Sequence, residues 1–357
     1  MKSLINLLPW KPGYSGFGSY IKRVVPFLKG TRLQIDSKGR IAMIDESCWS
    51  ALDPPLAATQ YLRFLQRLTL LQHGVNISHL LQSYGFNKHE IDVIYSPFFD
   101  SLLTLSSIPQ LITCPDLIPL RTHISNKAYL RYRIWQPIHL SFSTKIITYC
   151  NHVADQLINM NVHSSRIEII PCGINISKKR ITFPMTRDII IIARHDNHKN
   201  IYSFLKGIAK YQLIQPDWSG YVRIVGKTGR ETKKINKALK ELPRPKQIKF
   251  INSVSQELLT DWIRSSSVLV SASRDEGFDY PVLEAKAEGL PTLISDIPVH
   301  REFHSESSLF FSLDDENSDF CHWLGKLLND LSLWQDLSKK GYNLAANMSL
   351  EKQGKHI

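Results

Sequence analysis

Short runs of apolar, β-branched residues alternate along the chain with longer segments whose apolar residues recur at helical spacing. The strongest buried-strand signal is the run Asp188–Ala193, which contains four consecutive isoleucines. We expect strands at Ser3–Leu8, Arg40–Ile44, Ile91–Tyr95, Gln110–Thr113, Lys145–Tyr149, Ile167–Ile170, Asp188–Ala193, Tyr221–Val225, Gln247–Ile251, Ser267–Ser271 and Thr292–Ser295. We expect helices near Phe17–Leu28, Pro54–His73, Ile124–Ser143, His152–Met160, Asn200–Tyr211, Glu231–Leu242, Val254–Ser265, Pro281–Glu288 and Phe320–Asn347. This alternation predicts an α/β fold with parallel sheets built from βαβ units.

A break in the pattern divides the chain into two predicted domains, which also fits its length of 357 residues. The break is the polar, basic segment Asn175–Arg187, which contains Pro184. We place an N-terminal domain at residues 1–175, a second domain at 186–345 and a short tail at 346–357. Two doubly wound domains facing each other would hold their ligands at the carboxyl ends of the strands, in the cleft between them.

The most informative stretch follows the predicted strand Ser267–Ser271. A polar loop carries Glu276 and Gly277, Pro281 is favoured as the first helical residue, and Glu284 is expected in the first helical turn. Loop amides at a helix N-terminus form a ready anion site, and the two carboxylates can accept hydrogen bonds from vicinal hydroxyls. Taken alone, Glu284 could equally complement the helix dipole, with Glu276 simply solvated.

The whole string is more specific than its two glutamates. The segment Glu276–Glu284 matches the Glu-x7-Glu signature of the retaining GT-B glycosyltransferases of family 4, the group 1 transferases, and Gly289–Glu302 resembles the strand and turn that follow it in that family. The resemblance spans nearly the whole chain, most strongly after Asp188. It implies a GT-B fold of two facing Rossmann-like, doubly wound domains, and sugar transfer from a nucleotide diphosphate donor with retention of configuration.

The diphosphate is expected to meet Arg194 and Lys199, which lie five residues apart directly after the Asp188–Ala193 strand. An arginine fork and a lysine point charge suit a diphosphate, and the family has both here. The segment Ser15–Tyr20 resembles the family's glycine-rich loop, with Gly16 retained. The segment Gln110–Leu120 resembles the family's strand ending in His-Asp, although proline stands at the histidine position.

The resemblance assigns roles to the remaining positions. Glu276 would bind sugar hydroxyls and Glu284 the ribose hydroxyls, while Asp116 either orients a sugar or is only a helix cap or turn residue. The proposed catalytic set is Glu276, Arg194, Lys199 and Asp116. The proposed donor-binding set is Gly16, Gly226, Ser253, Val254, Gly277, Phe278, Asp279, Tyr280 and Glu284. No cofactor or metal is expected, because the leaving group's charge would be met by cations and backbone amides and no Asp-x-Asp metal signature is found.

Composition and net charge indicate which classes of binding partner and which cellular compartment to expect. The net charge of +12 favours anionic partners and is densest between Lys227 and Lys249, where a solvated helix face is the alternative reading. No apolar run is long enough for a membrane span. The five widely spaced cysteines lack any metal spacing, which predicts reduced thiols in a cytoplasmic protein.

A basic, aromatic helix between Arg121 and Trp135 raises the hypothesis of peripheral contact with an anionic membrane at the inner face of the plasma membrane. A solvated amphipathic helix explains it equally well. The expected substrates are a nucleotide diphosphate sugar and a saccharide or lipid-linked acceptor, in cell-surface polysaccharide synthesis. GDP-mannose is the preferred donor and a UDP-sugar the alternative.

Three functions other than glycosyl transfer are compatible with parts of the sequence. A nucleotide-sugar epimerase would share the fold but lacks this Glu-x7-Glu loop context, and a phosphorylase would need a pyridoxal phosphate lysine and a much longer chain. A non-catalytic GT-B partner subunit draws support from Pro115 and from the short C-terminal tail, but the pattern of Arg194, Lys199, Glu276 and Glu284 argues against it. Nucleic-acid binding rests on net charge alone and is not expected.

Overall fold

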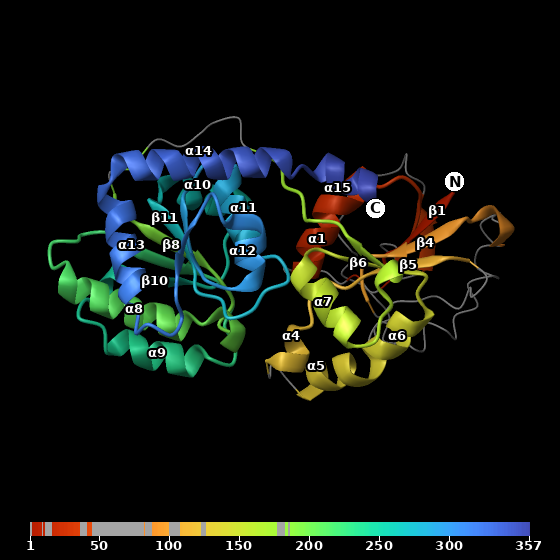
Figure 1. Ribbon diagram of the computed structural model, residues 1–357, viewed down its shortest axis with the longest axis horizontal. Helices are drawn as coiled ribbons and strands as arrows, with labels where there is room; N and C mark the ends of the chain where they lie inside the picture. The colour runs from red at the N-terminus through yellow and green to blue at the C-terminus, as the bar shows by residue number, and fades with distance from the viewer. Residues whose placement is uncertain are drawn as a thin grey trace. The chain divides into compact units, whose positions relative to one another are not determined.

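The computed structural model describes residues 2–8, 10, 16–35, 41–44, 82, 88–99, 108–122, 126–176, 183–184 and 186–357 (Figure 1). The helix predicted at Pro54–His73 lies outside these residues. The chain forms two compact units. Unit 1 comprises Met1–Leu117, Lys127–Pro171 and Leu350–Ile357, and unit 2 comprises Ile118–Asn126 and Cys172–Ser349.

Unit 1 is built on a seven-stranded sheet with the order β3-β2-β1-β4-β5-β6-β7. Its strands are β1 (Ser3–Asn6), β2 (Thr31–Ile35), β3 (Ile41–Ile44), β4 (Val93–Ser96), β5 (Gln110–Thr113), β6 (Lys145–Thr148) and β7 (Ile167–Ile169). Only the β2–β3 pair at the edge is antiparallel. The chain order reverses between β1 and β4, which makes their carboxyl ends the switch point of this sheet.

The helices of unit 1 follow the predicted pattern with local departures. Helix α1 (Gly16–Val24) runs into the 3-10 turn η1 (Val25–Phe27), and α15 (Leu350–His356) packs against both. Helix α7 (Asn151–Asn159) follows β6. The segment predicted as one helix over Ile124–Ser143 is divided into three successive pieces. These are α5 (Asn126–Leu130), a π-helical turn (Arg131–Trp135) and α6 (Gln136–Phe142).

Unit 2 contains a six-stranded, fully parallel sheet with the order β10-β9-β8-β11-β12-β13. Its strands are β8 (Ile189–Ile192), β9 (Val222–Val225), β10 (Ile248–Ile251), β11 (Val268–Ser271), β12 (Thr292–Ser295) and β13 (Leu309–Phe311). Strand β8 pairs with β9 on one side and with β11 on the other, so the switch point of this sheet lies between β8 and β11.

Helices cover both faces of the unit 2 sheet. They are α8 (Ile201–Ile214), α9 (Thr232–Lys240), α10 (Gln256–Ser265), α11 (Tyr280–Ala287), α12 (Pro298–His304), α13 (Ser318–Asn329) and α14 (Leu331–Asn347). Alternate side chains of β8 enter two cores: Ile189 and Ile191 pack with α8 and α13, and Ile190 packs with α10 and α11. Successive side chains of a strand point to opposite faces, so this four-isoleucine run must be buried twice.

The α/β prediction is confirmed, and every predicted strand is present. The prediction of one helix over Phe320–Asn347 is wrong, because Asp330 interrupts it with φ −104° and ψ 100° and accepts a 2.9 Å hydrogen bond from the Leu333 amide as the cap of α14. Two strands, β2 and β13, were not predicted. The first has three polar residues among its five and buries Arg32, and the second is three residues long.

Candidate active site

The topology of unit 2 brings three loops together. Strands β8, β11 and β12 are consecutive in the sheet and parallel, so their carboxyl ends lie side by side. The loop after β8 carries Arg194 and Lys199, the loop after β11 carries Glu276 and Asp279, and His300 follows β12. Residues from three distant parts of the chain therefore meet at the switch point of the sheet.

The first two loops are also joined through their backbones. The amide of Arg274 donates a 2.7 Å hydrogen bond to the carbonyl of His198, and its guanidinium donates to the side-chain oxygen of Asn200 at 3.2 Å. Asn200 adopts the left-handed conformation, φ 51°, which asparagine tolerates better than most residues. This turn starts α8 immediately after Lys199 and fixes where the lysine emerges.

A lysine held between two carboxylates forms the charged centre, and we call Lys199, Glu276 and Asp279 the lysine–carboxylate cluster. The Lys199 ammonium donates to Oε1 of Glu276 and lies 3.7 Å from Oδ1 of Asp279. The three side chains are 17%, 8% and 2% exposed. Ionisable groups are seldom buried to this degree unless they are paired, so the cluster is a built feature rather than a chance surface contact.

Asp279 occupies an unusual backbone position. It has φ 61° and stands immediately before α11, yet its side chain makes no capping hydrogen bond to that helix. Its Oδ2 instead accepts hydrogen bonds from the Ser271 hydroxyl at 2.5 Å and from Nε2 of His300 at 3.0 Å. Burial opposes ionisation, but Lys199 and His300 outweigh it and hold the pKa of Asp279 well below its usual value.

Glu276 responds in the opposite direction. Burial, reinforced by the negative charge of Asp279, raises the pKa of Glu276 to about 7, although Lys199 opposes the change. Two adjacent carboxylates are thus driven apart in pKa by their surroundings. Such separation is characteristic of sites that bind or transform charged ligands.

Arg194 and Glu284 lie on elements that adjoin this centre, the loop after β8 and helix α11. The Arg194 side chain is 63% exposed, and its Nε lies 3.3 Å from Oδ2 of Asp196. Glu284 is half-buried on α11. The expectation that Glu284 lies in the first turn is wrong, because the left-handed Asp279 lets the helix begin at Tyr280 and makes Glu284 its fifth residue.

The other predicted donor-binding positions of unit 2 follow its strands. A side chain at Gly226, which follows β9, would collide with the Ala193 carbonyl, so only glycine fits this close approach. After β10, Ser253 is exposed and Val254 packs against one core. Gly277 and Tyr280 flank the buried ring of Phe278, which meets the ring of Phe303 edge-on with centroids 5.0 Å apart.

Two predicted site residues belong to unit 1. Gly16 is the first residue of α1, which follows β1 at the switch point of that sheet. Asp116 follows β5 and is half-buried, and its carbonyl lies 3.7 Å from Sγ of Cys114. Their roles beside the residues of unit 2 remain predictions.

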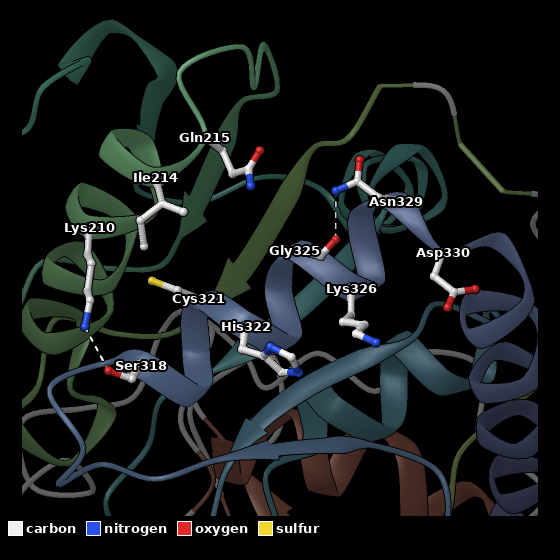
Figure 2. A pocket seen from close by; sticks show the side chains of 10 residues that line it. All are labelled: Lys210, Ile214, Gln215, Ser318, Cys321, His322, Gly325, Lys326, Asn329 and Asp330. Carbon is white, nitrogen blue, oxygen red and sulfur yellow. Dashed lines mark hydrogen bonds between the residues drawn. The ribbon is translucent and has the colours of Figure 1, made fainter.

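A hollow of about 590 Å³ lies between α8 and α13 of unit 2 (Figure 2). It is lined by Lys210 and Ile214 near the end of α8 and by residues of α13, including Cys321 and Lys326. Helix α8 starts at the carboxyl end of β8 and runs to the opposite edge of the sheet. The hollow is therefore separate from the lysine–carboxylate cluster, and none of its lining residues belongs to the predicted site.

The described part of the chain bears on the predictions about metal binding and membrane contact. There, no group of three or more His, Cys, Asp or Glu side chains is arranged to hold a metal ion, and no helix has the length and apolar character needed to cross a bilayer. The side chains of Cys114, Cys150, Cys172 and Cys321 are buried and form no disulfide with one another. Metal independence remains a prediction.

Two models of glycosyltransferase families match the sequence, one in each half of the chain. The family model described as "Glycosyl transferases group 1" matches residues 174–343, and the model described as "Glycosyltransferase Family 4" matches residues 57–178. The first match contains the whole lysine–carboxylate cluster and His300.

Two bacterial relatives are mannosyltransferases by name. The chain is 27% identical over 212 residues to the O-antigen chain mannosyltransferase RfbU of Salmonella typhimurium, which is 58% of each protein. It is 36% identical over 90 residues to the serotype-specific mannosyltransferase WbdA of Escherichia coli, covering 25% of this chain and 11% of WbdA. The matched regions thus span less than two thirds of either relative.

Solved structures share the fold at low sequence identity. The Anabaena protein Alr3699/HepE, solved with UDP and glucose, aligns with a TM-score of 0.73 at 14% identity and covers 100% of this chain and 98% of its own. The lipopolysaccharide outer core galactosyltransferase WaaB, in its apo form, gives 0.66 at 14% identity with the same coverage. Together with the family matches, they show that the chain belongs to the GT-B glycosyltransferases of family 4.

Proposed function

We propose that this protein is a retaining glycosyltransferase that moves a mannosyl group from a nucleotide diphosphate donor, GDP-mannose, to a glycan or lipid-linked saccharide during cell-surface polysaccharide synthesis. The observation that carries the proposal is the convergence of Lys199 and Glu276 at the switch point of a fully parallel sheet. A cation beside a sugar-binding carboxylate is what a diphosphate sugar requires at its scissile bond. Family membership supports the reaction class.

The charge of the leaving group sets the main chemical demand. When the bond between the anomeric carbon and the diphosphate breaks, negative charge grows on the diphosphate and must be stabilised in place. Lys199 is already positioned by the turn at Asn200, and it exchanges its contact with Glu276 for the phosphate oxygens. Glu276 is then released to accept hydrogen bonds from the sugar hydroxyls.

The transfer itself requires no protein base in this proposal. The acceptor oxygen bonds to the anomeric carbon on the face from which the diphosphate departs, and a phosphate oxygen takes the acceptor's proton. Configuration is therefore retained. Glu284, on α11, is assigned to the ribose hydroxyls.

The choice of donor rests on the relatives rather than on the site. RfbU and WbdA are both named mannosyltransferases, which favours a mannosyl donor. A UDP-sugar is the alternative, and the shared fold with proteins solved with UDP does not decide between them. We further propose that the reaction proceeds without a metal ion and at the cytoplasmic side of the membrane that holds a lipid-linked acceptor.

The proposal is tested with the purified full chain. A panel of GDP- and UDP-sugars is screened by thermal shift, because a ligand that binds the folded state raises Tm. The selected donor is then incubated with a lipid-linked saccharide, and the anomeric configuration of the product is read by NMR. We expect GDP-mannose to give the largest shift and an α-linked mannosyl product, with equal rates in EDTA and in magnesium.

A Glu276→Gln variant completes the test. It keeps the shape of the side chain but removes the carboxylate, and we expect transfer to fall by roughly 10²- to 10³-fold with Tm little changed. Wild-type rates in this variant would contradict the site assignment. Complete loss of wild-type activity in EDTA, restored by magnesium, would contradict metal independence.

A further inference from the structure

Two buried histidines stand one helical turn apart on α12 and have different surroundings. His300 and His304 are both 0% exposed, and their ring centroids are 6.3 Å apart. His300 contacts a carboxylate and a backbone carbonyl. Within the described residues, neither ring nitrogen of His304 has a hydrogen-bond partner, and burial, reinforced by the charges of Lys286 and His300, lowers its pKa well below the usual value. His304 is therefore neutral, whereas the protonation of His300 depends on its hydrogen-bond partners.

The hydrogen-bond partners of His300 determine its protonation. Its Nδ1 lies 2.8 Å from the carbonyl oxygen of Ser295, which can only accept. The Ser295 hydroxyl, 3.3 Å from the same nitrogen, already donates to the carbonyl of Ser273. Nδ1 must therefore carry a proton.

The other ring nitrogen meets a second acceptor. Nε2 lies 3.0 Å from Oδ2 of Asp279, an oxygen that also accepts from the Ser271 hydroxyl. A neutral imidazole with its proton on Nδ1 would present a lone pair to this carboxylate, and both partners would be acceptors. The contact is satisfied only if a proton lies between Nε2 and Oδ2.

The remaining charges around the pair show where that proton lies. Lys199 approaches the other oxygen of Asp279 at 3.7 Å, which favours the ionised carboxylate. Lys286 and His300 both act electrostatically on His304, and His300 also acts on Asp296, which stands four residues before it in the chain. These contacts favour an ionised Asp279, with the shared proton on Nε2 of His300.

We propose that His300 is a positioning residue for the donor diphosphate, acting as a buried imidazolium that neutralises Asp279 and so leaves the charge of Lys199 available to the phosphates. This inference rests on the proposed function. If His300 were neutral, the single positive charge of Lys199 would face two carboxylates, and the cluster would carry net negative charge where an anion must bind. If His300 is an imidazolium, it neutralises the charge of Asp279 at Oδ2, the oxygen that does not face Lys199.

The same contact explains why Asp279 does not cap α11. Aspartate is among the preferred N-cap residues. As an N-cap, the carboxylate would bind the free amides at the start of α11, which the proposed function reserves for the donor. Ser271, His300 and Lys199 together turn the carboxylate away from that position. His300 thus sets both the charge and the direction of Asp279.

A charge-rescue experiment tests the proposal. His300→Gln removes the imidazolium, and we expect the Kd for GDP or UDP, measured by calorimetry, to rise on the order of 10- to 100-fold because an unbalanced buried charge now faces the diphosphate. Adding Asp279→Asn to His300→Gln removes that charge and is expected to restore most of the affinity. A purely structural role predicts that the double variant binds no better than His300→Gln, and this result would overturn the proposal.

A second measurement is independent of any donor. The side-chain ¹⁵N resonances of histidine distinguish an imidazolium from a neutral ring, and the His300 signals are assigned by their loss in His300→Gln. We expect His300 to be doubly protonated at pH 7 and His304 on the same helix to be neutral. A neutral His300 would overturn the inference even if the protein binds GDP or UDP. Failure of the wild type to bind either nucleotide would instead contradict the proposed function, while the resonances still decide the state of His300.

Discussion

The two ends of the unit 2 sheet differ in what they hold. At the carboxyl end, Lys199, Glu276 and Asp279 are largely withdrawn from solvent and paired with one another. At the opposite end, the hollow between α8 and α13 is open, and its polar lining residues such as Lys326 and Asn329 are exposed. Burial of charge, which costs free energy and persists only where partners compensate for it, favours the cluster.

The largest expected effect separates these two ends with one kind of substitution. Lys199→Ala removes the cation that is already positioned to bind the diphosphate. It also leaves the buried carboxylates of Glu276 and Asp279 without the ammonium between them. We expect kcat/KM for the donor to fall by roughly 10³-fold, at the upper end of what loss of one preorganised donor costs. Steady-state kinetics with the selected donor measure this loss.

Lys326→Ala is the matched control, because it removes the same side chain from α13 at the hollow. We expect its kcat/KM to equal that of the wild type. Equal losses in the two variants would mean that the hollow, and not the cluster, holds the substrate, or that both changes act through folding. Tm values for the two proteins distinguish these outcomes.

An effect of intermediate size concerns pH and needs no substrate. Glu276 has a pKa of about 7 in the folded protein against 4.5 for a free glutamate. Between these values the folded chain binds more protons than the unfolded chain at this site, so the group's contribution to stability is complete below pH 4.5 and is lost as pH rises through 7. We expect Glu276→Gln to remove this part of the pH dependence of Tm.

Asp279 provides an internal contrast. Its pKa lies below the usual value, so its contribution is lost only as pH falls below the range in which a free aspartate titrates. Melting curves between pH 4.5 and 8 therefore report Glu276 with little interference from Asp279. Identical Tm profiles for the wild type and Glu276→Gln would show that burial does not raise the pKa of Glu276.

Much of this end of the molecule was predictable from sequence because the signals are local. Four consecutive isoleucines predict the buried strand β8, and the Arg194–Lys199 spacing follows it directly. Glu276 lies in the loop that follows another apolar run. The order of strands in a parallel sheet then places both loops at one edge.

His300 could not be assigned in the same way. Its partner Asp279 is 21 residues earlier, and their contact depends on β11 and β12 being neighbours and on Asp279 adopting a left-handed backbone. Neither condition has a sequence signature, since a non-glycine residue at positive φ is uncommon. The helix break at Asp330 differs, because an aspartate three residues before its capped amide is a readable N-cap signal that the longer apolar periodicity outweighed.

The smallest expected effect concerns Arg194, the second cation assigned to the diphosphate. Its side chain is 63% exposed and its ion pair with Asp196 spans 3.3 Å, so its charge is screened by water before any donor arrives. We expect Arg194→Ala to raise the donor KM by roughly fivefold, equivalent to about 1 kcal/mol, with kcat nearly unchanged. Arg194→Lys keeps the charge without the fork and should recover part of the loss if charge attraction dominates. A fall in kcat as large as that of Lys199→Ala would mean that Arg194 becomes buried against the diphosphate in the transition state, and the contrast between a preset and a solvated cation would no longer hold.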